Sequence, residues 1–190
     1  RGECALSCRV GACALSSTFG RLAVIGVGLI GGSLARALRA AGRIDEVIGC
    51  GRGQANLEQA VELGVIDRYT HDIADAVSSA DLVFLALPLG AMRAAFAVLN
   101  DALPAGALIT DGGSAKGSVV ADCRAAAPGL LDRFIPGHPI AGKERNGVAA
   151  SSAGLYENRR VILTPLSGND PRSVERVRSM WQACGAEVSE

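Results

Sequence analysis

Residues 21–33 read RLAVIGVGLIGGS, and this segment indicates the fold class of the chain. Its first half is a short apolar run typical of a buried strand, and it passes directly into the glycine-rich sequence GVGLIGG. The pattern over residues 30–41 then predicts a helix that Gly42 ends. A GxGxxG sequence placed between a strand and a helix is the arrangement that binds a dinucleotide.

Each glycine of this turn has a physical task. Gly26 permits the tight turn, Gly28 lets a pyrophosphate approach the backbone, and Gly31 lets the helix pack closely on the strand. The N-terminus of the helix faces the negative charge of the phosphates. The alternative is a glycine-rich turn without a ligand. We predict cofactor contacts along this turn, at Gly26, Gly28, Leu29, Ile30 and Gly31.

Short apolar runs alternate with longer amphipathic runs through the rest of the chain. We expect strands over residues 46–50, 81–88, 107–111, 134–139 and 160–165, and helices over 55–63, 91–100, 116–127 and 172–183. Such alternation predicts an α/β fold with a doubly wound, mostly parallel sheet of the Rossmann type. We assign residues 21–190 to this dinucleotide-binding domain and expect residues 1–20 to form an unstructured extension.

Composition narrows the class of protein. The 190 residues carry a formal net charge of +0, which argues against nucleic-acid binding and against a polybasic membrane surface. No apolar stretch reaches the roughly 20 residues that a membrane-spanning helix needs. The six cysteines form no CxxC pair, so we predict no metal site and no redox dithiol. Buried thiols in a cytoplasmic protein are the simplest interpretation.

The end of the second predicted strand bears on which dinucleotide binds. NAD-binding domains carry an acidic residue there, which holds the ribose hydroxyls. This chain reads Cys50-Gly51-Arg52 instead, without a carboxylate. Gly51 leaves room and Arg52 supplies positive charge for a 2′-phosphate, so we predict NADP, with NAD as the alternative. The competing interpretation is that Arg52 is an ordinary exposed arginine.

Candidate chemistry belongs in the loops at the carboxyl ends of the strands. Two loops stand out there, TDGGSAKG at residues 110–117 and GHPIAGKE at residues 137–144. The chain has two histidines, and His71 lies in a polar stretch that reads as a solvated loop. His138 lies between Gly137 and Pro139 at the end of an apolar run. A histidine is the usual general base near neutral pH, although a structural role for His138 stays open.

The motifs GVGLIGGS, TDGGSAKG and HPIAGKE, in this order and spacing, resemble the prephenate/arogenate dehydrogenase family of tyrosine biosynthesis. The resemblance covers the chain from about residue 21 to its end, and the GRGQ segment resembles the NADP-preferring members. It implies an oxidoreductase that decarboxylates prephenate or arogenate oxidatively and passes a hydride to a nicotinamide.

The resemblance also implies roles for particular residues. His138 matches the catalytic histidine that accepts the proton of the substrate's ring hydroxyl, and Ser114 matches the serine that supports it. Glu144 matches an acidic residue near the substrate, and Pro88 falls where the family lines the cofactor's ribose. Simpler interpretations stay open for two of them. Ser114 could cap the following helix, and Glu144 could be an exposed loop carboxylate.

The family continues into an all-helical domain that forms a homodimer and completes the substrate pocket. We expect that domain to be absent from these 190 residues. Two other functions stay open, namely another NADP-dependent dehydrogenase of the hydroxyacid or imine-reductase kind, and a nucleotide-binding module without catalysis.

Overall fold

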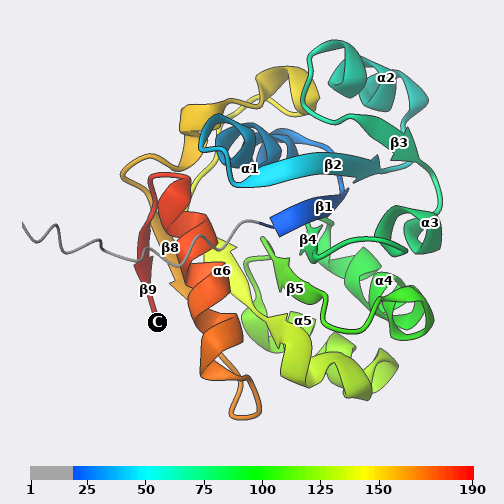
Figure 1. Ribbon diagram of the computed structural model, residues 1–190, viewed down its shortest axis with the longest axis vertical. Helices are drawn as coiled ribbons and strands as arrows, with labels where there is room; N and C mark the ends of the chain where they lie inside the picture. Colours follow the sequence, from blue (N-terminus) through cyan, green and yellow to red (C-terminus); the bar gives the residue numbers. More distant parts are fainter. Residues whose placement is uncertain (1–18) are drawn as a thin grey trace, which may run out of the picture.

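A six-stranded parallel sheet forms the centre of the computed structural model, which describes residues 19–190 (Figure 1). The strand order is β3-β2-β1-β4-β5-β6, and every neighbouring pair is parallel. The strands are β1 (Phe19–Ile25), β2 (Ile44–Cys50), β3 (Arg68–Thr70), β4 (Leu82–Leu85), β5 (Leu108–Asp111) and β6 (Phe134–Ile135). This order confirms the predicted Rossmann-type sheet, in which ligands bind where the order reverses between β1 and β4.

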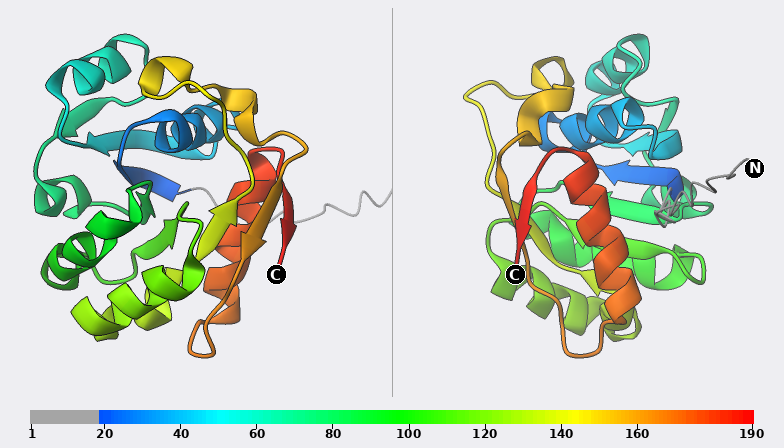
Figure 2. Two further views of the ribbon diagram at one scale, coloured as in Figure 1. Left: turned by 180° about the vertical axis from the view of Figure 1, so that it is seen from behind. Right: turned by 60° about the vertical axis from the view of Figure 1, so that its left-hand side comes forward.

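Helices cover both faces of this sheet (Figures 1 and 2). The helices are α1 (Leu29–Ala40), α2 (Gln54–Glu62), α3 (Ile73–Val77), α4 (Leu89–Ala102), α5 (Lys116–Ala126) and α6 (Pro171–Ala183). One buried apolar cluster joins α1, α2 and α6 to the sheet, and a second joins α3, α4 and α5 to it. The described domain therefore has three layers, with the sheet in the middle.

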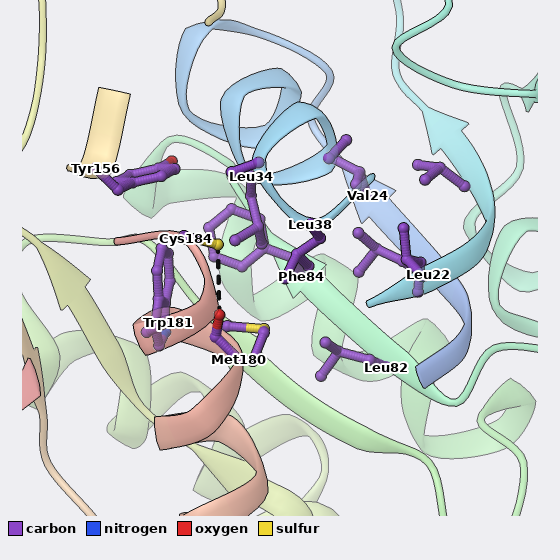
Figure 3. Close-up of a cluster of buried hydrophobic side chains, with 14 of the residues drawn as sticks. Leu22, Val24, Leu34, Leu38, Leu82, Phe84, Tyr156, Met180, Trp181 and Cys184 are labelled. Carbon is purple, nitrogen blue, oxygen red and sulfur yellow. Dashed lines mark hydrogen bonds between the residues drawn. The ribbon is translucent and has the colours of Figure 1, made fainter. Parts of the chain in front are cut away.

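Strand β1 shows why its sequence is apolar without a break. Leu22 and Val24 belong to one buried cluster, whereas Ala23 and Ile25 belong to the other. Successive side chains of a strand point to opposite faces, so a strand covered on both faces must be apolar at every position. Figure 3 shows the first cluster, where Leu22 and Val24 lie near Leu38 of α1.

A second, three-stranded sheet lies at the end of the domain. It contains β7 (Gly137–Pro139), β8 (Arg160–Leu163) and β9 (Glu187–Ser189) in the order β7-β8-β9. Strand β7 is antiparallel to β8, and β8 is parallel to β9. Short 3₁₀ helices occupy the connections, η1 (Pro128–Arg133), η2 (Val148–Ala150) and η3 (Ala153–Tyr156).

This sheet corrects the prediction of one strand over residues 134–139. The segment divides at Pro136, so that β6 completes the large sheet and β7 starts the small one. A proline has no N–H and cannot continue a ladder of hydrogen bonds, which accounts for a break at this residue.

Other boundaries also differ from the predicted ones. Strand β1 begins at Phe19 rather than residue 21, because the Phe19 ring is buried and its N–H donates to the Arg43 carbonyl at 3.1 Å. The pattern of apolar residues does not indicate β3 or α3, which are only three and five residues long. The rest of the predicted extension, residues 1–18, lies outside the described residues, as do Cys4, Cys8 and Cys13.

The cysteines of the described part are buried and unpaired, as predicted. Burial raises the pKa of the Cys50 thiol to about 11 and those of the Cys123 and Cys184 thiols to about 12. Such thiols stay protonated and unreactive. Within residues 19–190, no helix has both the length and the apolar character needed to cross a bilayer.

Candidate active site

The turn after β1 contacts the carboxyl end of β2 and the residue that follows β4. Gly26 adopts a φ of +105°, and a Cβ on it would stand 2.3 Å from the carbonyl oxygen of Ala86. Its N–H donates to the carbonyl of Cys50 at 2.8 Å. Only glycine combines a positive φ with the absence of a Cβ. The predicted tight turn is therefore present at the point where the strand order reverses.

The N-terminus of α1 has the features of a phosphate cradle. Gly28 caps the helix without a side-chain hydrogen bond, and the first turn contains no acidic residue. The space where a Cβ of Gly28 would stand has no heavy atom within 4 Å, so a ligand can approach the backbone there. The first N–H groups of a helix have no partner within the helix and favour an anion.

The other residues of the turn contribute through their backbone. A Cβ on Gly31 would stand 2.3 Å from the carbonyl oxygen of Gly26, so glycine is needed for α1 to approach β1. The Leu29 side chain is buried in the core, and the carbonyl of Ile30 accepts from the Tyr156 hydroxyl at 2.7 Å. The predicted cofactor contact of Leu29 is therefore left to its backbone N–H.

The loop after β2 is more ordered than its sequence indicated. Arg52 is exposed, as a residue that meets a phosphate would be. His71, interpreted above as a solvated loop residue, is exposed but has ring nitrogens 2.7 Å from the Gly51 carbonyl and 2.8 Å from Oε1 of Gln54. The sequence carried no signal for this contact, since His71 reaches the loop from the end of the neighbouring strand β3.

Pro88 and Ser114 follow the carboxyl ends of β4 and β5. Pro88 is the exposed N-cap of α4, two residues beyond the Ala86 carbonyl that crowds Gly26. Ser114 is exposed and does not cap α5, since the cap position belongs to Ala115. The capping alternative for Ser114 is therefore wrong, and its hydroxyl is available to a ligand.

His138 lies on β7, and the residue before it is held by the end of β5. The Gly137 N–H donates to Oδ1 of Asp111 at 3.1 Å, while Nζ of Lys116 donates to the Gly137 carbonyl at 2.6 Å. Lys116 also donates to Oδ2 of Asp111. The half-buried His138 is thus fixed at the same sheet edge as the glycine turn.

Asp111, the last residue of β5, holds both the turn that follows it and the residue before His138. Its Oδ2 accepts from the Gly113 N–H at 2.9 Å, as an aspartate ahead of a turn does. The carboxylate is fully buried, and the Lys116 side chain is 15% exposed. Sequence reasoning did not single out Lys116, although it lies within the TDGGSAKG motif.

The charges around His138 act in opposite directions. Burial lowers the pKa of the His138 ring, the Lys116 charge lowers it further, and the Asp111 charge raises it. Burial also raises the pKa of Asp111, against the effect of Lys116 and the two backbone N–H groups. Burial lowers the pKa of Lys116, against the effect of Asp111. The net result for His138 is a lowered pKa, which favours the neutral ring that a general base needs.

Glu144 stands apart from these groups. It is exposed in the segment after β7, between the exposed Lys143 and Arg145. Nothing within the described residues brings its side chain to His138 or to the glycine turn. A cavity of about 510 Å³ lies elsewhere, beside the C-terminal half of α1, where Arg36, Arg39 and Ser151 line it.

Comparison with known proteins places these features in a family. Residues 34–190 match the family described as "Prephenate dehydrogenase, nucleotide-binding domain". A cyclohexadienyl dehydrogenase of Zymomonas mobilis is 35% identical over 173 residues, which are 91% of this chain and 58% of that protein. A prephenate dehydrogenase of Bacillus subtilis is 33% identical over 87% of this chain and 44% of its own length. The chain thus spans about half the length of these relatives.

Solved structures agree. The prephenate dehydrogenase of Aquifex aeolicus, in complex with hydroxyphenyl propionate and NAD⁺, superposes with a TM-score of 0.83 at 37% identity, over 90% of this chain and 59% of that one. The arogenate dehydrogenase of Synechocystis superposes with a TM-score of 0.80 at 31% identity, over 89% of this chain and 58% of that one. The chain therefore belongs to the prephenate dehydrogenase family of oxidoreductases and contains that family's nucleotide-binding domain.

Proposed function

We propose that this chain binds NADP⁺ and, within a longer protein, catalyses the oxidative decarboxylation of prephenate or arogenate in tyrosine biosynthesis. One observation carries the proposal. Asp111 at the end of β5 holds the residue before His138, so the candidate base lies on the sheet edge where Gly26 and Gly28 form the cradle. The substrate is a small molecule, and we further propose a cytoplasmic homodimer, as the family resemblance implies.

The chemistry follows from the residue types. A bound nicotinamide dinucleotide supplies the acceptor for a hydride. His138, neutral at the sheet edge, takes the proton of the substrate's ring hydroxyl as the carbinol carbon loses its hydride and becomes a ketone carbon. The bond to the ring carboxylate then breaks and CO₂ leaves. The electron pair completes the aromatic ring as the ketone oxygen becomes a phenolate oxygen, which takes the proton back from His138. Ser114 positions the hydroxyl, whereas Glu144, which stands apart from His138, takes no part in this step.

The loop after β2 favours NADP⁺ over NAD⁺ in this proposal. No carboxylate follows Cys50, and the exposed Arg52 can meet a 2′-phosphate. Gly51 is half-buried with its carbonyl in contact with His71, and a Cβ on it would stand 3.6 Å from the Leu57 side chain. The Aquifex relative binds NAD⁺ in its solved complex, so the choice of dinucleotide is the part of the proposal that needs its own test.

Calorimetric titration of the chain with NADP⁺ and with NAD⁺ tests the cofactor. We expect tighter binding of NADP⁺, and a loss of roughly 10-fold or more in NADP⁺ affinity for Arg52→Ala, because an ion pair with a phosphate is lost. Arg93→Ala, which removes an exposed arginine from α4, should bind like the parent. If Arg52→Ala bound NADP⁺ with the same affinity as the parent chain, the proposed role of Arg52 would be refuted.

Turnover is tested in a longer protein. In a chain extended to the length of its relatives, we expect NADPH formation with prephenate or arogenate and none with simple hydroxyacids. His138→Asn should reduce kcat by about 10²–10⁴-fold while NADP⁺ binding stays unchanged. Turnover of hydroxyacids alone would favour another dehydrogenase activity, and binding without any turnover would indicate a nucleotide-binding module.

A further inference from the structure

Asp111 and Lys116 form a buried ion pair that the chemistry above does not use. Burying two charges is costly even when they pair, and well-packed apolar residues often serve stability as well or better. The pair is confined to one place, between the end of β5, the start of α5 and the residue before His138. Its location therefore calls for an explanation beyond stability.

The pair holds both peptide groups of Gly137. The N–H of the Pro136–Gly137 peptide donates to Oδ1 of Asp111, and the carbonyl of the Gly137–His138 peptide accepts from Lys116. The fit is tight, because a Cβ on Gly137 would stand 3.2 Å from both the Asp111 carbonyl oxygen and Oγ1 of Thr110. With both peptides fixed, the direction in which β7 leaves β6 and carries His138 past the end of β5 is fixed as well.

Strand β7 could not provide this restraint alone. It is three residues long, and β8 pairs with it on one side. The large sheet ends at β6, so Asp111 and Lys116 supply a link between the two sheets at Gly137.

We propose that Asp111 and Lys116 are positioning residues for His138: they clamp the peptides on either side of Gly137 and keep a positive charge near the imidazole. This inference rests on the proposed role of His138 as the base. In that role the clamp fixes the backbone that carries the ring, and the lysine charge favours the unprotonated ring that can accept a proton.

Histidine NMR of this chain tests the proposal without any turnover. The chain has two histidines, and His71 lies on β3's side of the large sheet, at the edge opposite β6, so both rings can be followed separately. We expect Lys116→Met to raise the pKa of His138, because the lysine charge lowers that pKa in the parent. Lys143→Met removes the chain's only other lysine, which is exposed, and should leave the His138 titration unchanged.

A second variant guards against misfolding. Lys116→Met leaves a buried carboxylate unpaired, whereas the double variant Asp111→Asn/Lys116→Met removes both charges together, which folded proteins tolerate better. It should raise the pKa of His138 by less than Lys116→Met does, because the loss of the Asp111 charge acts in the opposite direction. An unchanged His138 titration in either folded variant overturns the proposal.

A kinetic readout separates positioning from cofactor binding. In the extended chain, Lys116→Met should lower kcat and move the acid limb of its pH profile upward, while NADP⁺ affinity and KM stay near those of the parent. Lys116→Arg keeps the charge and a hydrogen-bond donor. Its acid limb in the pH profile of kcat should therefore lie where that of the parent lies. If the NMR shift occurs but His138→Asn keeps full turnover, the clamp stands and the proposed catalytic role of His138 fails.

Discussion

The lowered pKa of His138 makes the free energy of unfolding depend on pH. Burial and the Lys116 charge lower its pKa below the ordinary 6.5. Between the lowered value and 6.5 the unfolded chain binds more protons at this residue than the folded chain, so the free energy of unfolding rises with pH across that window. We expect His138→Asn to remove this dependence, which urea denaturation at pH 5–8 measures.

The second histidine supplies the matched control for this measurement. His71→Asn should keep the rise that His138 causes, because Lys116 and Asp111 are not among the groups that contact His71. The effect should be small, since the His138 side chain is only half-buried and solvent screens part of the interaction. Parallel stability profiles of the parent and His138→Asn would contradict the assigned shift.

Single residues also show what sequence spacing can and cannot predict. Gly26 and Gly31 were predicted from the motif, because their requirement is local: a positive φ at one, and a close approach of helix to strand at the other. Lys116 was not predicted as a partner of Gly137, because the contact joins residues 21 positions apart through a bend that only the fold creates. His71 was missed for the same reason.

At the scale of elements, Asn56 joins α2 to two separate loops. Its Nδ2 donates to the Val27 carbonyl in the glycine turn at 2.6 Å, and its Oδ1 accepts from the Val148 N–H at 3.0 Å. Both valines are buried, so the Asn56→Ala variant leaves two backbone groups without a partner or a route to water. We expect the free energy of unfolding to fall by about 1–3 kcal/mol for each group left unpaired.

Urea denaturation and NADP⁺ titration measure this effect together. The cofactor affinity should also fall, because the Val27 peptide belongs to the turn that forms the cradle. Gln59→Ala, on the same helix but exposed, is the matched control and should change neither quantity. Identical stability in the two variants would show that Asn56 does not brace the turn.

The elements differ in how well the sequence predicted them. The parallel core was predicted because its strands are continuous apolar runs and its helices are amphipathic. The small sheet was not, since β7 and β9 are three residues each and their pairing is set by contacts with β8. Pro136 carried the one local signal for the break between β6 and β7.

At the scale of the whole molecule, Trp181 lies at the junction of the two sheets. It is fully buried, and its ring packs edge-on against two other rings (Figure 3). The ring centroids lie 5.7 Å apart for Phe84 of β4 and 5.1 Å apart for Tyr156. Helix α6, which carries Trp181, leads into β9 of the small sheet. The aromatic cluster therefore couples the sheet that forms the cradle to the sheet that carries His138.

Because Trp181 is the chain's only tryptophan, its fluorescence reports on this junction alone. If both sheets form one cooperative unit, fluorescence and far-UV circular dichroism should give the same urea midpoint. We expect coincidence, since one buried cluster runs from the large sheet through α6 to Val161 and Leu163 of β8. A fluorescence transition at lower urea would mean that α6 and the small sheet detach first, and His138 would then leave the sheet edge before the cradle unfolds.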